Sequence, residues 1–540
     1  MKKILITSLL ATSLFANDKI DLDWLKKQPK SIAKDFYIWR YLNQDITPKE
    51  ANNALSMVKS FNNKIFYRYI EKSNDKVLQD YRNCIKTSTK KLLNKEPYCI
   101  EAGLSVYDAT KLSKKEIAKL IDKVENEYTQ LSQNLLVLAS PLPFETLQQV
   151  DNETFFNVFN QVGSKYRLKY FNHHFFLSTL ERLAKDKKFE QTIKLIVTNL
   201  KMDKAQKSLL NIDSTNLRYQ ATFFLAINAI RHNKLYKAMV YLDDAYKKAY
   251  YQMQKDNIIF WQYKITNSKE YLDKLSSSWD LNIYSLYALD KQNKELNNIF
   301  YSIKQVDNKT IETKINSFDL KYPFNWFPIL KDIKKLDTSK MSKYEKLFNT
   351  PETLGHLAFI KEKFSKYRNS YFITPYIEDI NNMPKDKQAM LYAIARQESR
   401  FIPTSISSAY AMGMMQIMPF LSKHIAKELK EVYDIDEQLN PKVNMRYGAY
   451  HLDFLQRRLD HPLFVAYAYN GGIGFTKRLL KTDLFKKGKF EPYLSMELLP
   501  YNETKKYGKK VLANYFIYQN YLNPKNKISF SNLMKIKNKR

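Results

Sequence analysis

The chain has 540 residues, more than one hydrophobic core accommodates, so the sequence predicts several domains. Its hydrophobic fraction of 44% is typical of a globular protein, and beyond residue 16 no apolar stretch approaches the length of a membrane-spanning helix. The net charge of +33 would first suggest nucleic acid as a partner, but no recognisable nucleic-acid-binding module accompanies it, and we expect no such partner.

The first 16 residues have the pattern of a cleaved secretory signal peptide. Lys2 and Lys3 form a positive start, an apolar stretch follows to Phe15, and Ala16 is the small residue before cleavage. No cysteine follows that would carry a lipid. We therefore expect a periplasmic protein without a stable membrane anchor, and an uncleaved anchor is the alternative. In that compartment the basic surface would face the anionic cell wall or the membrane surface, or would simply be a lysine-rich solvated surface.

The two cysteines, Cys84 and Cys99, lie close together in the exported part of the chain. In an oxidising compartment such a pair can form a disulfide that closes a short loop. The sequence alone contains no geometry that decides between a bonded and a free pair.

Glycine is scarce in the first part of the chain, where only Gly103, Gly163 and Gly355 precede position 400. Tight hairpins use glycine for positive φ, so this long stretch is better built from helices joined by short polar loops. Residues 221–230 and 236–249 have helical spacing and predict a helix pair around a turn. Such pairs resemble degenerate tetratricopeptide-like units, and an irregular helical domain without a repeat is the alternative.

Turn residues and composition divide the chain into five segments. Prolines and a Trp-Phe pair interrupt the helical pattern between about 300 and 375, which indicates a smaller linker domain. Pro384 then precedes a strongly helical segment, and the C-terminal end is basic. The predicted segments are 1–16 (signal peptide), 17–300 (α-helical superhelical domain), 301–375 (linker domain), 376–522 (a second α-rich domain) and 523–540 (basic tail).

One carboxylate lies on an otherwise apolar helix stripe in the second α-rich domain. Leu391, Ile394 and Ala395 follow helical spacing, and Glu398 falls on the same stripe. Burial disfavours an ionised carboxylate and raises its pKa, as a general acid at neutral pH requires. No Asp or Glu follows until Glu428, so the local sequence supplies no second carboxylate. Taken alone, Glu398 could equally be a frayed helix-end residue or a satisfied buried acid.

Further motifs follow the Glu398–Ser399 pair in order. Residues 413–419 read Gly-Met-Met-Gln-Ile-Met-Pro, and residues 468–472 read Ala-Tyr-Asn-Gly-Gly. This ordered set resembles the catalytic domain of the soluble lytic murein transglycosylases, a lysozyme-like family with the pattern Glu-Ser, Gly-Leu-Met-Gln-Ile/Leu-Met-Pro and Ala-Tyr-Asn-Ala-Gly. Residues 500–507 are also similar to the family's Pro-Phe-x-Glu-Thr-Arg-x-Tyr segment.

The resemblance implies a fold class and a partner. It implies a mainly all-α protein with a long N-terminal superhelix closing into a ring, a small helical linker domain and a C-terminal lysozyme-like catalytic domain. Before the motifs the resemblance is one of architecture, because no motif can be matched there. It further implies peptidoglycan glycan strands as the substrate, with cell-wall synthases as candidate protein partners.

The resemblance also assigns roles to single residues, with Glu398 as the catalytic acid and base. The residues alone allow plainer roles: Ser407 as a turn residue, Tyr469 as a core aromatic and Glu503 as a surface residue at a helix start. The expected substrate-binding residues are Ser407, Gln416, Met418, Tyr469, Asn470, Glu503 and Tyr507.

The chain departs from the family pattern chiefly at Tyr410, where a small residue, commonly glycine, is usual. A bulky ring there is expected to narrow or reshape the groove near the acid, and so to alter substrate preference more than chemistry. The other departures are milder, since Met414 replaces leucine and Gly471–Gly472 replaces Ala-Gly.

The implied reaction is a non-hydrolytic cleavage of the β-1,4 bond between N-acetylmuramic acid and N-acetylglucosamine. Glu398 protonates the leaving oxygen, the substrate's N-acetyl carbonyl stabilises the cation, and the C6 hydroxyl closes a 1,6-anhydro ring. No metal or organic cofactor is expected, because His173 and His174 are adjacent rather than spaced as ligands. The alternatives are a lysozyme-type hydrolase, with Glu503 as its second carboxylate, and an inactive peptidoglycan-binding scaffold.

Overall fold

The computed structural model describes residues 19–304 and 318–536, which fall into two compact units. Unit 1 combines Met1–Asn74 with Ile299–Arg458, and unit 2 combines Asp75–Asn298 with Leu459–Arg540. The predicted signal peptide lies outside the described residues, as do part of the predicted linker and the last residues of the basic tail.

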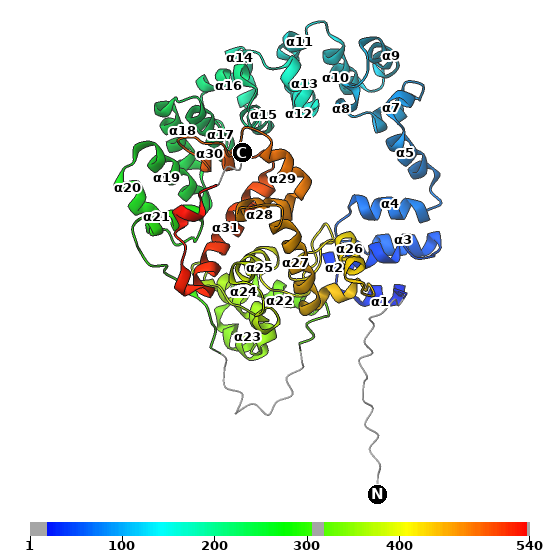
Figure 1. The fold of residues 1–540 in the computed structure, drawn as a ribbon. Helices are drawn as coiled ribbons and strands as arrows, with labels where there is room; N and C mark the ends of the chain where they lie inside the picture. The colour runs from blue at the N-terminus through cyan, green and yellow to red at the C-terminus, as the bar shows by residue number, and fades with distance from the viewer. Residues whose placement is uncertain (1–18, 305–317, 537–540) are drawn as a thin grey trace. The chain divides into compact units, whose positions relative to one another are not determined.

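The described parts of the chain are almost entirely helical (Figure 1), which confirms the predicted mainly all-α fold class. Their strands are limited to β1 (Ile299–Phe300) and β2 (Ser370–Tyr371), which pair in parallel, Ile299 opposite Ser370. No helix in these parts combines the length and the apolarity that crossing a bilayer requires.

Unit 1 begins with four short helices whose N-termini are capped by polar side chains. Ser31 and Asn62 each accept a backbone N–H from the first turn of the following helix, and Thr47 forms a reciprocal capping box with Glu50. The helices of this unit are α1 (Leu22–Lys27), α2 (Ile32–Tyr41), α3 (Pro48–Ser56), α4 (Asn63–Lys72), α22 (Trp326–Ile333), α23 (Met341–Leu347), α24 (Leu354–Phe364), α25 (Lys385–Glu398), α26 (Pro419–Leu429) and α27 (Pro441–Gln456).

Unit 2 contains a row of consecutive helices, each packed on a near neighbour in the sequence (Figure 1). The predicted pair is present as α17 and α18, joined by a turn in which Asn233 has a φ of 54°. The helices of this unit are α5 (Lys76–Lys86), α6 (Thr89–Leu92), α7 (Pro97–Gly103), α8 (Val106–Ala109), α9 (Lys114–Val124), α10 (Thr129–Ala139), α11 (Pro143–Gln149), α12 (Asn152–Gln161), α13 (Gly163–Tyr170), α14 (Leu177–Ala184), α15 (Phe189–Val197), α16 (Asp203–Ser208), α17 (Tyr219–Arg231), α18 (Leu235–Lys248), α19 (Gln252–Thr266), α20 (Lys269–Ser276), α21 (Ile283–Lys291), α28 (Pro462–Gly471), α29 (Ile473–Leu480), α30 (Tyr493–Glu497), α31 (Asn502–Leu522) and α32 (Phe530–Leu533).

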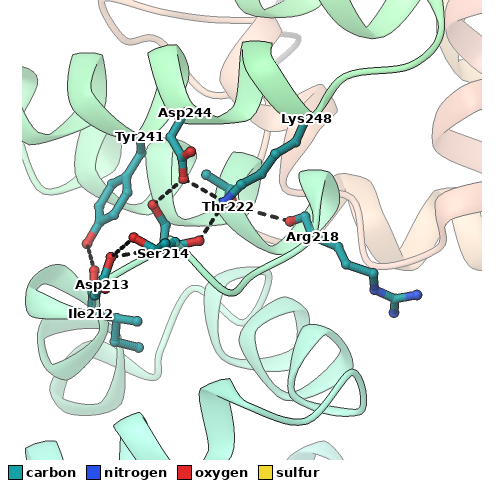
Figure 2. A network of polar contacts seen from close by, with 9 residues as sticks. Ile212, Asp213, Ser214, Arg218, Thr222, Tyr241, Asp244 and Lys248 are labelled. Atoms are coloured by element: carbon teal, nitrogen blue, oxygen red, sulfur yellow. Dashed lines mark hydrogen bonds and ion pairs between the residues drawn. The ribbon is translucent and has the colours of Figure 1, made fainter.

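The loop that enters α17 is fastened to α18 by polar contacts (Figure 2). The Tyr241 hydroxyl donates to the Ile212 carbonyl oxygen over 2.8 Å, and Ser214 Oγ donates to Asp244 Oδ2 over 2.6 Å. Lys248 Nζ lies 2.6 Å from the same Asp244 oxygen and donates to the Ser214 carbonyl. These contacts satisfy loop backbone groups that helix packing would otherwise leave unpaired.

The two cysteines are joined by a disulfide, which decides the question that the sequence left open. Cys84 in α5 and Cys99 in α7 are bonded across a sequence separation of 15, and both side chains are buried. Closing a loop of this length in the unfolded chain is worth about 3 kcal/mol of stability. The bond thus holds together the first helices of unit 2.

The predicted domain boundaries stay a prediction, because each unit draws on more than one predicted domain. Unit 1 contains the start of the predicted superhelical domain, the linker and the first half of the predicted catalytic domain. Unit 2 contains the rest of the superhelical domain and the second half of the catalytic domain.

Candidate active site

Glu398 is the last residue of α25, a helix that is buried along most of its length. Leu391 and Ile394 are fully buried, so the predicted apolar stripe is confirmed. Glu398 itself is half-buried where the helix ends. The C-terminal end of a helix disfavours negative charge, so the helix dipole opposes ionisation of a carboxyl group placed there.

A buried ion cluster anchors the end of α25 on both sides of the acid. Arg396 Nη2 lies 2.5 Å from Glu362 Oε1, and Arg400 pairs with the other oxygen of the same carboxylate. Glu362 also accepts the Tyr371 backbone N–H over 2.9 Å. Because the arginines lie two residues before and two after Glu398, the backbone that carries the acid is fixed from both sides. The sequence analysis missed this cluster, although paired arginines around Glu398 were a visible signal.

Residues 405–418 form a tight loop next to the helix end. Met412 pairs with Ile406 and with Ile417 through isolated bridges, and the Gly413 N–H donates to the Ser405 carbonyl over 2.9 Å. Ser399 Oγ donates to the Met414 carbonyl oxygen over 2.8 Å, so the serine of the Glu-Ser motif ties the loop to α25. These motif residues therefore shape the loop.

Ser407 and Gln416 both use part of their hydrogen-bonding capacity inside this loop. Ser407 Oγ accepts the Ala411 N–H over 2.9 Å, which makes Ser407 a turn residue with a hydroxyl proton still to donate. Gln416 has a φ of 49°, and its Nε2 donates to the Ser405 and Gly413 carbonyl oxygens over 3.0 and 2.8 Å. The Gln416 side-chain oxygen is thus the atom left for an incoming donor.

Buried contacts from α27 hold the other side of the loop. Asn444 is fully buried, its Oδ1 accepts the Met415 N–H over 2.7 Å, and its Nδ2 donates to the Met412 carbonyl oxygen over 3.1 Å. Gly413 has a φ of 77°, and a Cβ there would lie 2.4 Å from Asn444 Cγ. Met415 is fully buried against Gly448, so it belongs to the core, whereas Met418 is half-buried at the start of α26. Sequence reasoning did not find Asn444, because nothing local distinguishes it from a helix-surface amide.

The ring of Tyr410 lies in the core, so it does not narrow a groove directly, and the expectation that it reshapes the groove stays a prediction. Its side chain is fully buried, and its hydroxyl accepts a hydrogen bond from Asn62 Nδ2 over 3.0 Å. The ring lies in a core cluster with residues of α2, so it points away from the surface. Burial raises the pKa of Tyr410 to about 12, which keeps the hydroxyl neutral.

In unit 2 the structure brings two of the predicted motifs together. Asn470, near the end of α28, donates from Nδ2 to Glu503 Oε1 over 3.1 Å and accepts from Thr504 Oγ1 at Oδ1 over 2.8 Å. Glu503 is exposed at the start of α31, and Tyr469 is half-buried beside Asn470. The side chain of Asn470 thereby orders both segments, and Thr504 is a further contributor that the sequence analysis did not select.

Farther along α31 the residues belong to the interior. Tyr507 is buried, so little of its side chain is left for a ligand. Lys509 Nζ lies 2.6 Å from the buried Glu497 Oε1 and donates to the Tyr284 hydroxyl over 2.7 Å. Burial lowers the pKa of the neighbouring Lys505 to about 7. This cluster ties α31 to α21 and so fixes the helix that carries Glu503.

The predicted site residues are thus divided between the two units. Glu398, Ser407, Gln416 and Met418 lie in unit 1, and Tyr469, Asn470, Glu503 and Tyr507 lie in unit 2. Within residues 19–304 and 318–536, no three His, Cys, Asp or Glu side chains gather as a set of metal ligands.

Comparison with known sequences gives a match for the segment that carries these motifs. Residues 375–490 match the family model described as the transglycosylase SLT domain. The soluble lytic murein transglycosylases of Salmonella typhimurium and Escherichia coli K12 are each 27% identical over 207 residues, which is 37% of this chain and 31% of the relative. The matched region therefore spans less than a third of these curated relatives.

Solved structures show the same fold over a longer part of the chain. The inactive mutant of lytic transglycosylase Slt from Pseudomonas aeruginosa is 14% identical with a TM-score of 0.50, covering 94% of this chain and 89% of that one. A complex of the 70-kDa soluble lytic transglycosylase with bulgecin A is 17% identical with a TM-score of 0.50, covering 94% of this chain and 84% of that one. At these identities the likeness shows a shared fold.

Proposed function

Because residues 375–490 belong to the transglycosylase SLT domain family, we propose that the chain is a peptidoglycan lytic transglycosylase. The observation that carries this proposal is the position of Glu398. It is half-buried at the end of a buried helix, and the loop with the Gly-Met-Met-Gln-Ile-Met-Pro run is tied to that helix end. The relatives' printed names describe the same activity on murein.

Glu398 serves as acid and then as base. Its carboxyl proton goes to the glycosidic oxygen as the bond to C1 of N-acetylmuramic acid breaks, and the departing N-acetylglucosamine keeps that oxygen as its hydroxyl. The substrate's N-acetyl carbonyl stabilises the cation at C1, as in substrate-assisted glycosidases. The Glu398 carboxylate then takes the proton of the C6 hydroxyl, whose oxygen bonds to C1 and closes the anhydro ring. No water is consumed, and Glu398 ends protonated.

Loop residues in unit 1 bind the sugar. The side-chain oxygen of Gln416 accepts from a sugar hydroxyl or amide, because its nitrogen is engaged within the loop. Ser407 donates its hydroxyl proton to the substrate, and the half-buried Met418 packs on a sugar face.

The remaining predicted substrate-binding residues lie in unit 2. Tyr469 and Asn470 end α28, and the hydrogen bond from Asn470 orients Glu503. Tyr507 is the weakest of these assignments, because its side chain is buried. Glu503 is exposed, and it is the carboxylate that the hydrolase alternative would use.

The expected place of action is the periplasm, on glycan strands of the cell wall. The disulfide between Cys84 and Cys99 supports export, since such bonds persist mainly in oxidising compartments. Cell-wall synthases remain candidate protein partners.

The test is mass spectrometry of the soluble products released from isolated peptidoglycan. Wild-type protein should release 1,6-anhydro-muropeptides, and Glu398→Gln should release none while unfolding at the same temperature. Products with reducing ends would point to a hydrolase and to Glu503 as the next residue to test. Retained binding without products from either protein would favour the scaffold.

A further inference from the structure

The loop beside Glu398 is held from behind by the first helices of the chain, all within unit 1. The Tyr410 hydroxyl accepts from Asn62 Nδ2 over 3.0 Å and donates to the Asp35 carbonyl oxygen over 3.3 Å. Lys64 Nζ donates to the Ala409 carbonyl oxygen over 2.7 Å. Two neighbouring loop residues are therefore bonded to residues that precede them by more than three hundred positions.

The ring of Tyr410 is also closely packed. Its centroid lies 5.6 Å from that of Phe36 and 5.5 Å from that of Trp39, both in α2. Lys64 Nζ lies 5.0 Å from the ring centroid, within the range of a cation–π contact. Such aromatic pairs stabilise the packing beyond what the buried area alone provides.

The same core extends to the centre of the loop. Met412, which forms both bridges of the loop, and Leu439 are fully buried in one cluster with Phe36 and Ile38. Beside this core, both oxygens of Asp436 accept from Arg40 Nη1, over 2.7 and 2.8 Å. The surface of the loop that faces away from a ligand is thus covered by α2 and α4.

Asn62, which donates the hydrogen bond to Tyr410, is itself held in place. Asp35 is fully buried, and its carboxylate oxygens accept the N–H groups of Lys59 and Ser60 over 2.7 and 2.9 Å. These bonds shape the turn that leads to Asn62, whose Oδ1 caps α4 by accepting the Ile65 N–H over 3.1 Å. Asn62 therefore presents Nδ2 to Tyr410 from a rigid position.

The backbone at Tyr410 needs this support. Its φ of 67° lies in the left-handed region, which is strained for a bulky residue. A small residue, the usual occupant in the resembling family, would adopt the conformation with less strain. The chain instead keeps a tyrosine there, and the contacts to α2 and α4 offset the strain.

We propose that α2 and α4 are a positioning element for the catalytic loop, with Tyr410 as the positioning residue through which they act. This inference rests on the proposed function. The first part of the chain determines the positions of Ser407 and Gln416 relative to Glu398. Residues 375–490 alone would therefore lack the contacts from α2 and α4 that hold the loop.

Three full-length variants separate positioning from simple stability. Tyr410→Gly keeps the left-handed backbone and removes the anchor, Tyr410→Phe keeps the ring and removes the hydroxyl, and Asn62→Ser keeps a helix cap and withdraws the donor. The matched control is Tyr241→Phe, which removes a buried hydroxyl that donates to backbone carbonyl oxygens in unit 2. The readouts are kcat and KM on peptidoglycan fragments, thermal unfolding, and hydrogen–deuterium exchange of residues 405–417.

In Tyr410→Gly, kcat should fall about 10- to 100-fold while KM changes less than about threefold, because misplaced groups affect the reacting geometry most. Exchange in residues 405–417 should rise at least about tenfold. Tyr410→Phe and Asn62→Ser should show the same changes at smaller size, and Tyr241→Phe should change neither kcat nor loop exchange.

Wild-type kcat and loop protection in both Tyr410→Phe and Asn62→Ser, or an equal fall of kcat in Tyr241→Phe, would overturn the proposal. The exchange measurement needs no substrate, so it decides the role of Tyr410 even if wild-type protein releases no anhydro product. An inactive wild type with a protected loop would count against the proposed function alone.

Discussion

The loop at residues 405–418 in unit 1 and the helix pair α17–α18 in unit 2 keep their shapes by different means. In the loop, Tyr410, Gly413 and Gln416 have positive φ, and the buried amide of Asn444 bonds the backbone in two places. In the pair, α17 is buried along nearly its whole length, and polar contacts fasten the entering loop to α18 (Figure 2).

The difference matters for how each region tolerates change. Apolar helix packing is spread over many atoms, so a single substitution there removes a fraction of it. A loop held by a few directional bonds loses its shape when one of them goes, because each buried polar group left behind has no other partner. We therefore expect substitutions in the loop to lower activity by more than their loss of stability would explain. Substitutions in the helix pairs should lower stability alone.

The largest effect is expected for Gly413→Ala, compared with Gly472→Ala. A Cβ at Gly413 would lie 2.3 Å from the Gln438 carbonyl oxygen, whereas one at Gly472 meets nothing within 4 Å. Gly472→Ala should therefore cost only backbone strain, about 1–3 kcal/mol, and Gly413→Ala should cost more and abolish product formation. Urea unfolding and product assays measure both. Equal losses in the two variants would mean that the loop is no more constrained than the turn after α28.

Next comes Asn444→Leu, with Asn228→Leu as its counterpart in α17. Both amides are fully buried, but Asn444 bonds the site loop whereas Asn228 Nδ2 donates to the Gln206 carbonyl oxygen over 2.9 Å. Asn444→Leu removes both hydrogen bonds, and the loss at the buried Met415 N–H should cost about 1–3 kcal/mol, whereas the Met412 carbonyl oxygen still accepts the Ile417 N–H. We expect kcat to fall about 100-fold in Asn444→Leu. In Asn228→Leu only the melting temperature should drop, and a comparable loss of kcat there would remove the distinction between the regions.

The disulfide gives an effect of intermediate size that should be confined to stability. A Cys84→Ala and Cys99→Ala double variant should lose about 3 kcal/mol, because the unfolded chain regains the freedom of the closed loop. Its kcat at a temperature where it is folded should equal that of wild-type protein. Reduced wild-type protein should unfold at the same lowered temperature, and lost activity in the folded double variant would contradict the expectation.

The last prediction concerns acid stability and His356 in α24, and its effect on activity at neutral pH should be the smallest. This ring is fully buried, 4.8 Å from the Trp326 ring and 5.1 Å from that of Phe348, and burial lowers the pKa of His356 to about 3. In the unfolded chain the His356 ring binds a proton below about pH 6.5, whereas in the folded chain the buried ring stays neutral down to about pH 3. Stability is therefore full above pH 6.5 and lost as the pH falls toward 3, by at most about 1.4 kcal/mol per pH unit.

The variant His356→Phe should flatten this part of the pH profile, measured by urea unfolding at a series of pH values between 7 and 4. His232, whose pKa burial also lowers, is only partly buried, so His232→Phe is the control expected to leave most of the slope. An unchanged slope in His356→Phe would show that the ring is protonated without unfolding.

Periodicity and motifs predicted much of this molecule. The stripe through Leu391 and Ile394 is the buried face of α25, and the turn at His232–Asn233 separates α17 from α18 as expected. These features depend on residues within a few turns of one another, and local spacing encodes them. The predicted roles of Ser407, Gln416 and Met418 remain predictions, although the structure gives each a defined place in the loop.

The contacts that fix the loop could not be predicted, because they join distant parts of the chain. The sequence suggested that the Tyr410 ring affects the groove near Glu398, and only its contacts with Asn62 and Phe36 show that it belongs to the core. In the sequence Asn444 is indistinguishable from an ordinary helix residue, and only the structure shows that its amide oxygen accepts the Met415 N–H. A single sequence contains no spacing that links such positions, so tertiary packing alone determines them.

The most direct test of the proposed chemistry is to digest peptidoglycan in water labelled with a heavy oxygen isotope. If Glu398 removes the proton of the C6 hydroxyl and the C6 oxygen bonds to C1, the new muramic acid ends should carry no label. Glu398→Gln should release no product. Label at C1 of the released muramic acid would show that water is the nucleophile and would contradict the transglycosylase mechanism.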